Sequence, residues 1–298
     1  MATFVRFDQS SDIVLSTEKI NSNAWSDDVN ELTTFFTSST EALNYAHPSS
    51  SGQFFLNVFK TSTNATSGNP EFSIAYGHKA GSGSRDFSTG TGGTGFNATK
   101  AIYSQYRQLA YGDTAQSFTF NGTTPDDIYV INIERARIKQ GLKPGSLNLQ
   151  LVSGSLGTGA RLHLTDDSVT TTGSATLTNL GRQFNLVSGS SGVMNGTTLA
   201  QTVSGSYGFV YPDSGIIVMN PSALKTVIGN LQAPDSADVV ADQFDITPSA
   251  SSGTDGLNVK KLYHAISGAK SFIVDAEEKV SSQFYFSRIT NQEFNYST

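Results

Sequence analysis

Short stretches of aromatic and β-branched residues, bounded by clusters of Gly, Ser, Thr and Asn, recur along most of this 298-residue chain. Such stretches are typical of β-strands, and the clusters between them are typical of turns. They lie at residues 54–60, 71–76, 118–120, 128–134, 147–152, 161–165, 183–187, 207–211, 215–219, 263–266, 271–276 and 283–289. The pattern predicts a mainly β fold with a few short helices (a β-rich α+β protein), in which antiparallel strands form a sandwich or barrel-like sheets.

Two of these stretches indicate more than their secondary structure. In residues 71–76, Phe72, Ile74 and Tyr76 alternate with mostly polar residues, so we expect their side chains to share one face of a strand. Residues 128–133 are almost continuously apolar or β-forming, which is typical of a strand buried on both faces. We expect this second strand to lie in the centre of a sheet.

Two helices are expected. Residues 98–111 carry an apolar stripe at spacings of four and three, formed by Ile102, Tyr106 and Leu109. Residues 222–228 follow an Asn-Pro pair at positions 220 and 221, which is the pattern of an N-cap and a first helical residue. Residues 232–256 have the composition of a loop.

The length allows one large β unit or two modest domains. We expect an N-terminal β-rich part at residues 1–140, with a Gly-rich loop and one helix, and a second β-rich part at residues 141–298. A single intertwined domain remains the alternative.

Only 15% of the residues are charged, against about 25% in a typical soluble domain. Neutral hydroxyl and amide groups can be buried against a partner without the cost of desolvating charges. The composition therefore fits a large protein–protein interface, and it equally fits a turn-rich β protein.

The charge and the residue types exclude several partners. The net charge is −6 and the pI is about 5.2, whereas a nucleic-acid-binding protein usually has a basic face, so no nucleic-acid partner is expected. The chain has no cysteine, hence no disulfide and no thiolate metal site. Neither a signal peptide nor an 18-residue apolar run is present, so we expect folding in a cytoplasm and no membrane insertion.

The sequence offers no convincing catalytic motif. Residues 90–95 (GTGGTG) match the spacing of a dinucleotide-binding loop, but no apolar strand precedes them, so we expect residues 77–95 to be a flexible Gly-rich loop. No two of the four histidines have zinc-ligand spacing, and His163 is expected to point outward from a strand. The acidic pairs at 126–127 and 166–167 are interpreted as solvated turn residues. We therefore predict no enzyme activity, no cofactor, no metal and no small-molecule substrate.

Five segments together resemble virion structural proteins of large contractile-tailed phages, especially those that infect cyanobacteria and other marine bacteria. They are residues 25–40 (WSDDVNELTTFFTSST), 72–84 (FSIAYGHKAGSGS), 101–109 (AIYSQYRQL), 129–151 (YVINIERARIKQGLKPGSLNLQL) and 280–296 (VSSQFYFSRITNQEFNY). The resemblance implies a tail or baseplate protein of the virion, assembled in the host cytoplasm, whose partners are other virion proteins and copies of itself. It transfers no catalytic residues.

Two groups of residues are candidates for such contacts. Arg135, Arg137 and Lys139 place cations beside a tight turn, where they would form either a docking edge for an acidic neighbour or a solvated strand end. Phe284 and Phe286 share one face of a predicted strand, which would pack in the main sheet or against a neighbouring protein.

Two other functions are considered. A receptor-binding tail fibre or adhesin that recognises host-surface carbohydrate would need exposed aromatic side chains, for which Tyr207, Phe209 and Tyr211 are the best candidates. A fibre usually has a repetitive stalk sequence, and this chain has none. A secreted β-sandwich enzyme is disfavoured because the sequence shows neither a signal peptide nor a group of catalytic residues.

Overall fold

The computed structural model describes residues 8–10, 12–37, 55–63, 68–81, 98–152, 161–170, 175–196, 204–228 and 255–287. The Gly-rich segment 82–95, with its GTGGTG motif, lies outside these residues, and so do the predicted loop residues 232–254. The first residues of the expected flexible loop are described, and they continue a strand as far as His78.

The larger of the two described sheets contains twelve strands. In chain order these are β2 (Glu31–Leu32), β3 (Phe55–Val58), β4 (Phe72–His78), β5 (Asp127–Ile133), β7 (Asn148–Val152), β8 (Arg161–Asp166), β9 (Thr176–Thr178), β10 (Gly181–Ser190), β11 (Val193–Met194), β12 (Gly208–Tyr211), β13 (Ile216–Met219) and β14 (Phe272–Ile273). Their order across the sheet is β2-β14-β7-β8-β10-β12-β13-β5-β4-β3, while β9 and β11 both pair with β10. The expected β-rich α+β class is confirmed, and the described strand pairs are antiparallel.

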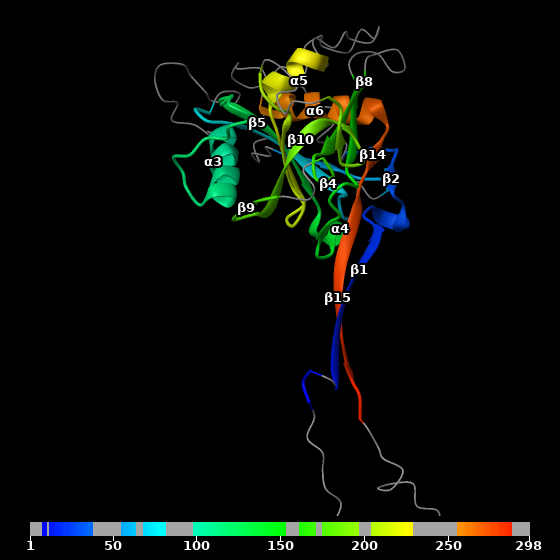
Figure 1. Cartoon of the computed structure of the whole chain (residues 1–298). Helices are drawn as coiled ribbons and strands as arrows, with labels where there is room; N and C mark the ends of the chain where they lie inside the picture. Colours follow the sequence, from blue (N-terminus) through cyan, green and yellow to red (C-terminus); the bar gives the residue numbers. More distant parts are fainter. Residues whose placement is uncertain are drawn as a thin grey trace, which may run out of the picture.

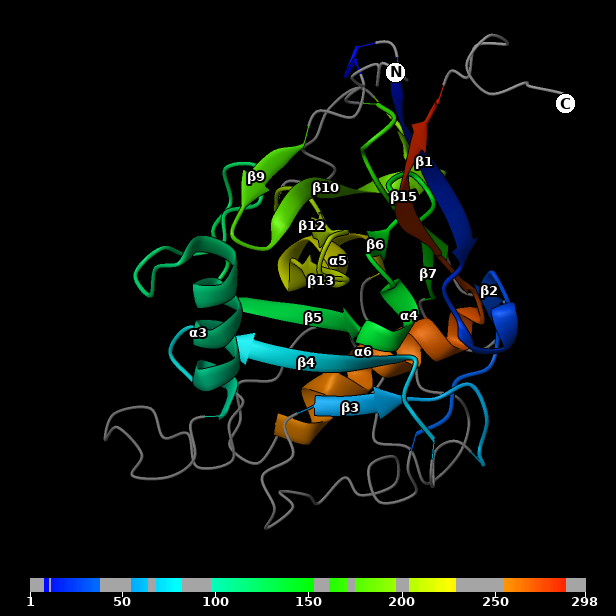
Figure 2. The same cartoon turned by 90° about the horizontal axis from the view of Figure 1, so that it is seen from below.

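The sheet curls until its two end strands approach each other. Just beyond β2 and β3, the backbone N–H groups of Phe36 and Phe59 each donate to the other's carbonyl at 2.8 Å. The side chains of both end strands, of the strands between them, and of helices α5 (Pro221–Ile228) and α6 (Asp255–Ala269) therefore pack in one apolar core. The arrangement is barrel-like, and the helices lie against the sheet (Figure 2).

A second, smaller core covers the outer face of the central strands. Helix α3 (Ala98–Tyr111) packs there so closely that a Cβ atom on Gly77 would lie 2.8 Å from the backbone nitrogen of Tyr103. The predicted helix bounds are confirmed, but the predicted stripe is only partly right. Leu109 is 42% exposed, whereas Tyr103 is fully buried against Phe118, with ring centroids 5.8 Å apart.

Strands β4 and β5 are confirmed in detail. Phe72, Ile74 and Tyr76 lie in the inner core, on one face of β4. Strand β5 pairs with β13 on one side and with β4 on the other, so it is an interior strand of the sheet, and five of its seven residues are buried. The sheet contains strands from both expected parts of the chain, residues 1–140 and 141–298. Strands β2 and β5 of the first part pair with β14 and β13 of the second.

One predicted strand is wrong. Residues 263–266 lie within helix α6, not in a sheet. Val259, Leu262, Ile266 and Ala269 are all buried, at spacings of three and four that mark one face of a helix. A four-residue window is too short to show this period. In addition, the predicted strand at 118–120 is reduced to a single bridge between Phe120 and Thr123.

The smaller sheet has three strands: β1 (Ile13–Asn23), β15 (Asp275–Tyr285) and the short β6 (Gly141–Leu142). Figure 1 shows β1 and β15 leaving the body together as a long two-stranded ribbon.

Candidate protein–protein interface

The ribbon of β1 and β15 projects far from the rest of the protein. The two strands pair in antiparallel fashion over eleven residues each, from Asn23 with Asp275 at the base to Ile13 with Tyr285 at the tip. At about 3.3 Å per residue the ribbon is roughly 35 Å long. Strand β6 pairs only with Ala276 and Glu277, so in the described part of the chain the distal ribbon has no third strand.

Apolar side chains cover both faces of the ribbon tip. Residues directly opposite each other in an antiparallel pair point to the same side. One face of the tip carries Ile13, Leu15 and Tyr285, and the other carries Val14 and Phe284. Leu15 is 71% exposed and Tyr285 is 62% exposed.

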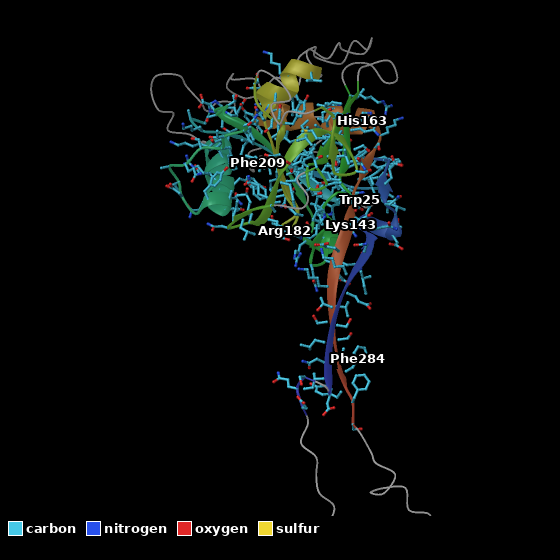
Figure 3. All side chains as sticks on the ribbon, in the orientation of Figure 1. Trp25, Lys143, His163, Arg182, Phe209 and Phe284 are labelled. Atoms are coloured by element: carbon cyan, nitrogen blue, oxygen red, sulfur yellow. The ribbon has the colours of Figure 1, made fainter. Side chains whose placement is uncertain are left out.

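Apolar exposure is concentrated on this ribbon. Half of the fourteen large hydrophobic side chains that are exposed in the described residues lie on it or directly beyond its tip, namely Val14, Leu15, Ile20, Val280, Phe284, Tyr285 and Phe286. Phe284 lies near the tip, far from the body (Figure 3). The predicted strand at this end of the chain is confirmed as far as Tyr285. It pairs with β1, so the alternative that Phe284 and Phe286 pack within the main sheet is wrong.

The exposed tip favours association with another surface. Full burial of an apolar side chain of this size is worth about 1.5–3 kcal/mol, so covering one that is half exposed would gain about 1 kcal/mol. An isolated two-stranded ribbon is only marginally stable in water, and its open edges can accept a further strand. A ribbon of this composition is stabilised when a partner covers it.

The base of the ribbon is held to the body by an ion-pair network. The Arg182 guanidinium, on β10, lies 2.6 Å from Asp213 Oδ1 and 2.8 Å from Glu277 Oε1, and Lys19 Nζ lies 3.4 Å from Glu277 Oε2. Burial by itself would raise the pKa of Asp213, but the hydrogen bonds from Arg182 outweigh burial and lower the pKa. The network joins both ribbon strands to β10 and to the turn after β12, at the lower edge of the body (Figure 3).

The predicted basic group lies against this base, but its members have different roles. Residues 135–138 form one helical turn, α4 (Arg135–Ile138), and not a strand end. Arg137 Nε lies 3.0 Å from the fully buried carboxylate of Glu71, so its charge is used inside the protein. Lys139 Nζ lies 4.0 Å from Glu278 on the ribbon. Arg135 is exposed, and no ion pair of the described residues includes it.

One contact beside the base has no signal in the local sequence pattern. The side-chain amide of Gln140 accepts a hydrogen bond from the backbone N–H of Lys279 at 2.9 Å and donates one to the Lys279 carbonyl at 3.3 Å. The amide therefore continues the hydrogen bonding of β6 along the edge of β15 as far as the backbone of Lys279.

The acidic pair at 166–167 is buried, so its interpretation as a pair of solvated turn residues is wrong. Asp166 and Asp167 are 2% and 1% exposed. Asp166 accepts a hydrogen bond from the Gly145 backbone at 2.8 Å, and Asp167 accepts two from Asn185, at 2.9 and 2.8 Å. Burial raises the pKa of Asp166. Both carboxylates join neighbouring segments of the fold to each other.

The aromatic residues considered for carbohydrate binding are buried. Tyr207, Phe209 and Tyr211 are 2%, 6% and 0% exposed, and Phe209, labelled in Figure 3, belongs to the smaller core beside α3. They provide no aromatic surface for a sugar ring. His163 is exposed between two buried leucines, as predicted.

Among the described residues, no three His, Asp or Glu side chains come close enough to one another to bind a metal ion. None of the helices in that part of the chain is long and apolar enough to span a bilayer. Comparison with protein-family models, curated proteins and solved structures finds no match to this chain. The exposed apolar tip and the ion-paired base make the ribbon the strongest candidate for a functional surface.

Proposed function

We propose that this chain is a structural, non-enzymatic component of a tailed-phage virion, located in the tail or baseplate, and that it acts through protein–protein contacts made by the β1/β15 ribbon. The observation that carries the proposal is the ribbon itself, which is anchored by ion pairs at its base and apolar on both faces at its tip. Its partners are other virion proteins and copies of itself.

The distribution of charge supports an anchoring role. The protein is poor in charged residues, yet four of them meet at the base of the ribbon: Lys19, Arg182, Asp213 and Glu277. These contacts fix the direction in which the ribbon leaves the body. A ribbon held in this way can be inserted into a neighbouring assembly without reorganisation of the body.

The resemblance to contractile-tailed phage proteins gives the setting of the proposal. Two of the resembling segments, 25–40 and 280–296, flank or include the ribbon. The carbohydrate-binding alternative has no support of this kind, since its three candidate aromatic residues are buried.

The experiment is to produce tailed particles in a host that supplies either the wild-type chain or a variant, and to measure the chain in purified particles by mass spectrometry. Replacing Phe284 and Phe286 together by serine should greatly reduce incorporation. The matched control is Leu177→Ser, which removes an apolar side chain that is 79% exposed on β9, away from the ribbon. Absence of the wild-type chain from particles, or incorporation of the double variant at the wild-type level, would refute the proposal.

A further inference from the structure

The two faces of the ribbon are complementary to each other, and from this we infer that the partner of the ribbon is a second copy of the same chain. The ribbons of successive copies pack side by side in the same direction, with one face of each copy against the opposite face of the next. This inference rests on the proposed role of the ribbon in protein–protein contacts, but it does not depend on the virion as the setting.

The two faces of the ribbon carry opposite charges at the same distance from its tip. Lys19 and Lys279 are directly opposite each other, so both ammonium groups lie on one face. The neighbouring pairs are Glu18 with Val280 and Ile20 with Glu278, which place two carboxylates on the other face. Glu277 also lies on the lysine face, opposite Asn21, but it is buried and pairs with Arg182 and Lys19, so lysines are the charges that this face presents to solution. A neighbouring carboxylate face would offset the repulsion between the two lysines.

These charges are accessible from solution. The side chain of Lys19 is 55% exposed even though it reaches Glu277, and that of Glu278 is 38% exposed even though Lys139 lies 4.0 Å away. Glu18 and Lys279 are also exposed, and neither makes an ion pair with another of the described residues.

The apolar tip fixes the direction of packing. The lysine face ends in Ile13, Leu15 and Tyr285, and the glutamate face ends in Val14 and Phe284. When two ribbons run in the same direction, apolar tip meets apolar tip and lysine meets glutamate. Ribbons packed in opposite directions would place an apolar tip against the charged base, and two identical faces would place lysine against lysine.

The contact uses two different surfaces of each copy, so it is heterologous. Such contacts repeat from copy to copy, and they produce a closed ring when the rotation between copies closes. With all ribbons pointing the same way, the ring has its bodies at one end and its apolar tips at the other.

The test reverses the charge of one face at a time. Variant K19E/K279E has two acidic faces, and variant E18K/E278K has two basic faces. We expect the wild-type chain to self-associate, and each variant to do so at least tenfold more weakly, in sedimentation and light-scattering measurements at low salt. The control K100E/K225E makes the same charge change as the first variant, on exposed lysines of α3 and α5, and should associate like wild type.

Two rescue experiments test the fold of the variants at the same time. An equimolar mixture of the acidic-face and basic-face variants should associate, because each supplies the face that the other needs. The chain with all four reversals should also associate, because its complementary faces have only exchanged places. Failure of both rescues, or a wild-type chain that is monomeric at its highest soluble concentration, would overturn the inference.

The two proposals fail in different ways. A wild-type chain that is monomeric but present in particles would remove the ribbon–ribbon contact and leave the virion role intact. A chain that self-associates through its charged faces but is absent from particles would do the reverse.

Discussion

Arg137→Ala should destabilise the protein strongly, although the residue lies near the surface. The Glu71 side chain is fully buried, and Arg137 Nε lies 3.0 Å from its carboxylate. The remaining polar contacts of Glu71 are with Ser26, whose backbone N–H donates at 3.2 Å and whose hydroxyl also donates. Burial raises the pKa of Glu71, and the positive charge of Arg137 opposes that rise. Without the guanidinium, the buried carboxylate keeps only the Ser26 donors and the positive charge of Lys60, which lowers the pKa of Glu71 less than Arg137 does.

The magnitude follows from the geometry. Removing one partner of a buried ion pair typically costs about 3–5 kcal/mol. Because the two Ser26 donors remain, we expect a value near the lower end, about 3 kcal/mol. For a protein of this size each kcal/mol lowers the melting temperature by about 2–4 °C, so the expected decrease is about 6–12 °C.

The assay is thermal unfolding followed by circular dichroism at neutral pH. The control is Arg135→Ala, two residues earlier, whose exposed side chain makes no ion pair with the described residues and should change stability by less than about 0.5 kcal/mol. The control separates loss of the buried pair from any effect of lost charge or helix propensity.

The pH dependence gives a second readout. Arg137→Ala should raise the folded-state pKa of Glu71 further above its ordinary value of 4.5, so the folded variant holds this proton more tightly than the unfolded chain. The difference in stability between variant and wild type should therefore be largest at neutral pH, and it should shrink as the pH falls toward 4.5. Equal stability of the Arg137 and Arg135 variants at neutral pH would refute the buried-pair account.

Three further predictions concern other parts of the protein. A chain that begins at Lys19 and ends at Lys279 lacks the distal ribbon. Its body should melt within about 3 °C of the full chain, because the removed strand residues lie outside both cores. Loss of soluble, folded protein would show that the body needs the distal ribbon. Burial raises the pKa of Asp127 from 3.8 to about 6, so its contribution to stability is present below 3.8 and is lost as the pH rises through 6. Asp127→Asn should flatten urea-unfolding stability across that window, and an unchanged pH slope would contradict this. The Asn220 side chain caps α5 through its oxygen and donates hydrogen bonds to two backbone carbonyls. Asn220→Ala should therefore lower the free energy of unfolding in urea by about 2–3 kcal/mol. Asn220→Asp keeps only the cap, so its free energy of unfolding should fall between those of the alanine variant and the wild type.

Local sequence patterns were sufficient for much of the body. The bounds of α3, the start of α5 after Asn220, and the placement of β5 inside the sheet with a strand on either side agree with the structure. Each of these features depends on residues within about one helical turn or one strand of each other, through hydrophobic period, capping and β-propensity. The same reasoning failed for residues 263–266, where a short apolar stretch is compatible with either a strand or a buried helix.

The candidate interface depended on contacts that the local sequence does not show. Residues at opposite ends of the chain, such as Ile13 and Tyr285, pair in the ribbon, and Arg137 finds its counter-charge at Glu71. A tight turn with three nearby cations looks the same in sequence whether a carboxylate from another strand reaches it or not.

The sequence by itself determined that the protein is β-rich, which segments form many of its strands and two of its helices, and that a strand near the C-terminus contains Phe284, two residues before Phe286. The tertiary structure decided that this strand pairs with β1 outside the body, so that both phenyl groups are exposed, while Asp166 is buried. The physical reason is that burial depends on what covers a side chain. The residues that cover a side chain in the folded protein are often distant from it in sequence, and a local sequence pattern contains no information about them.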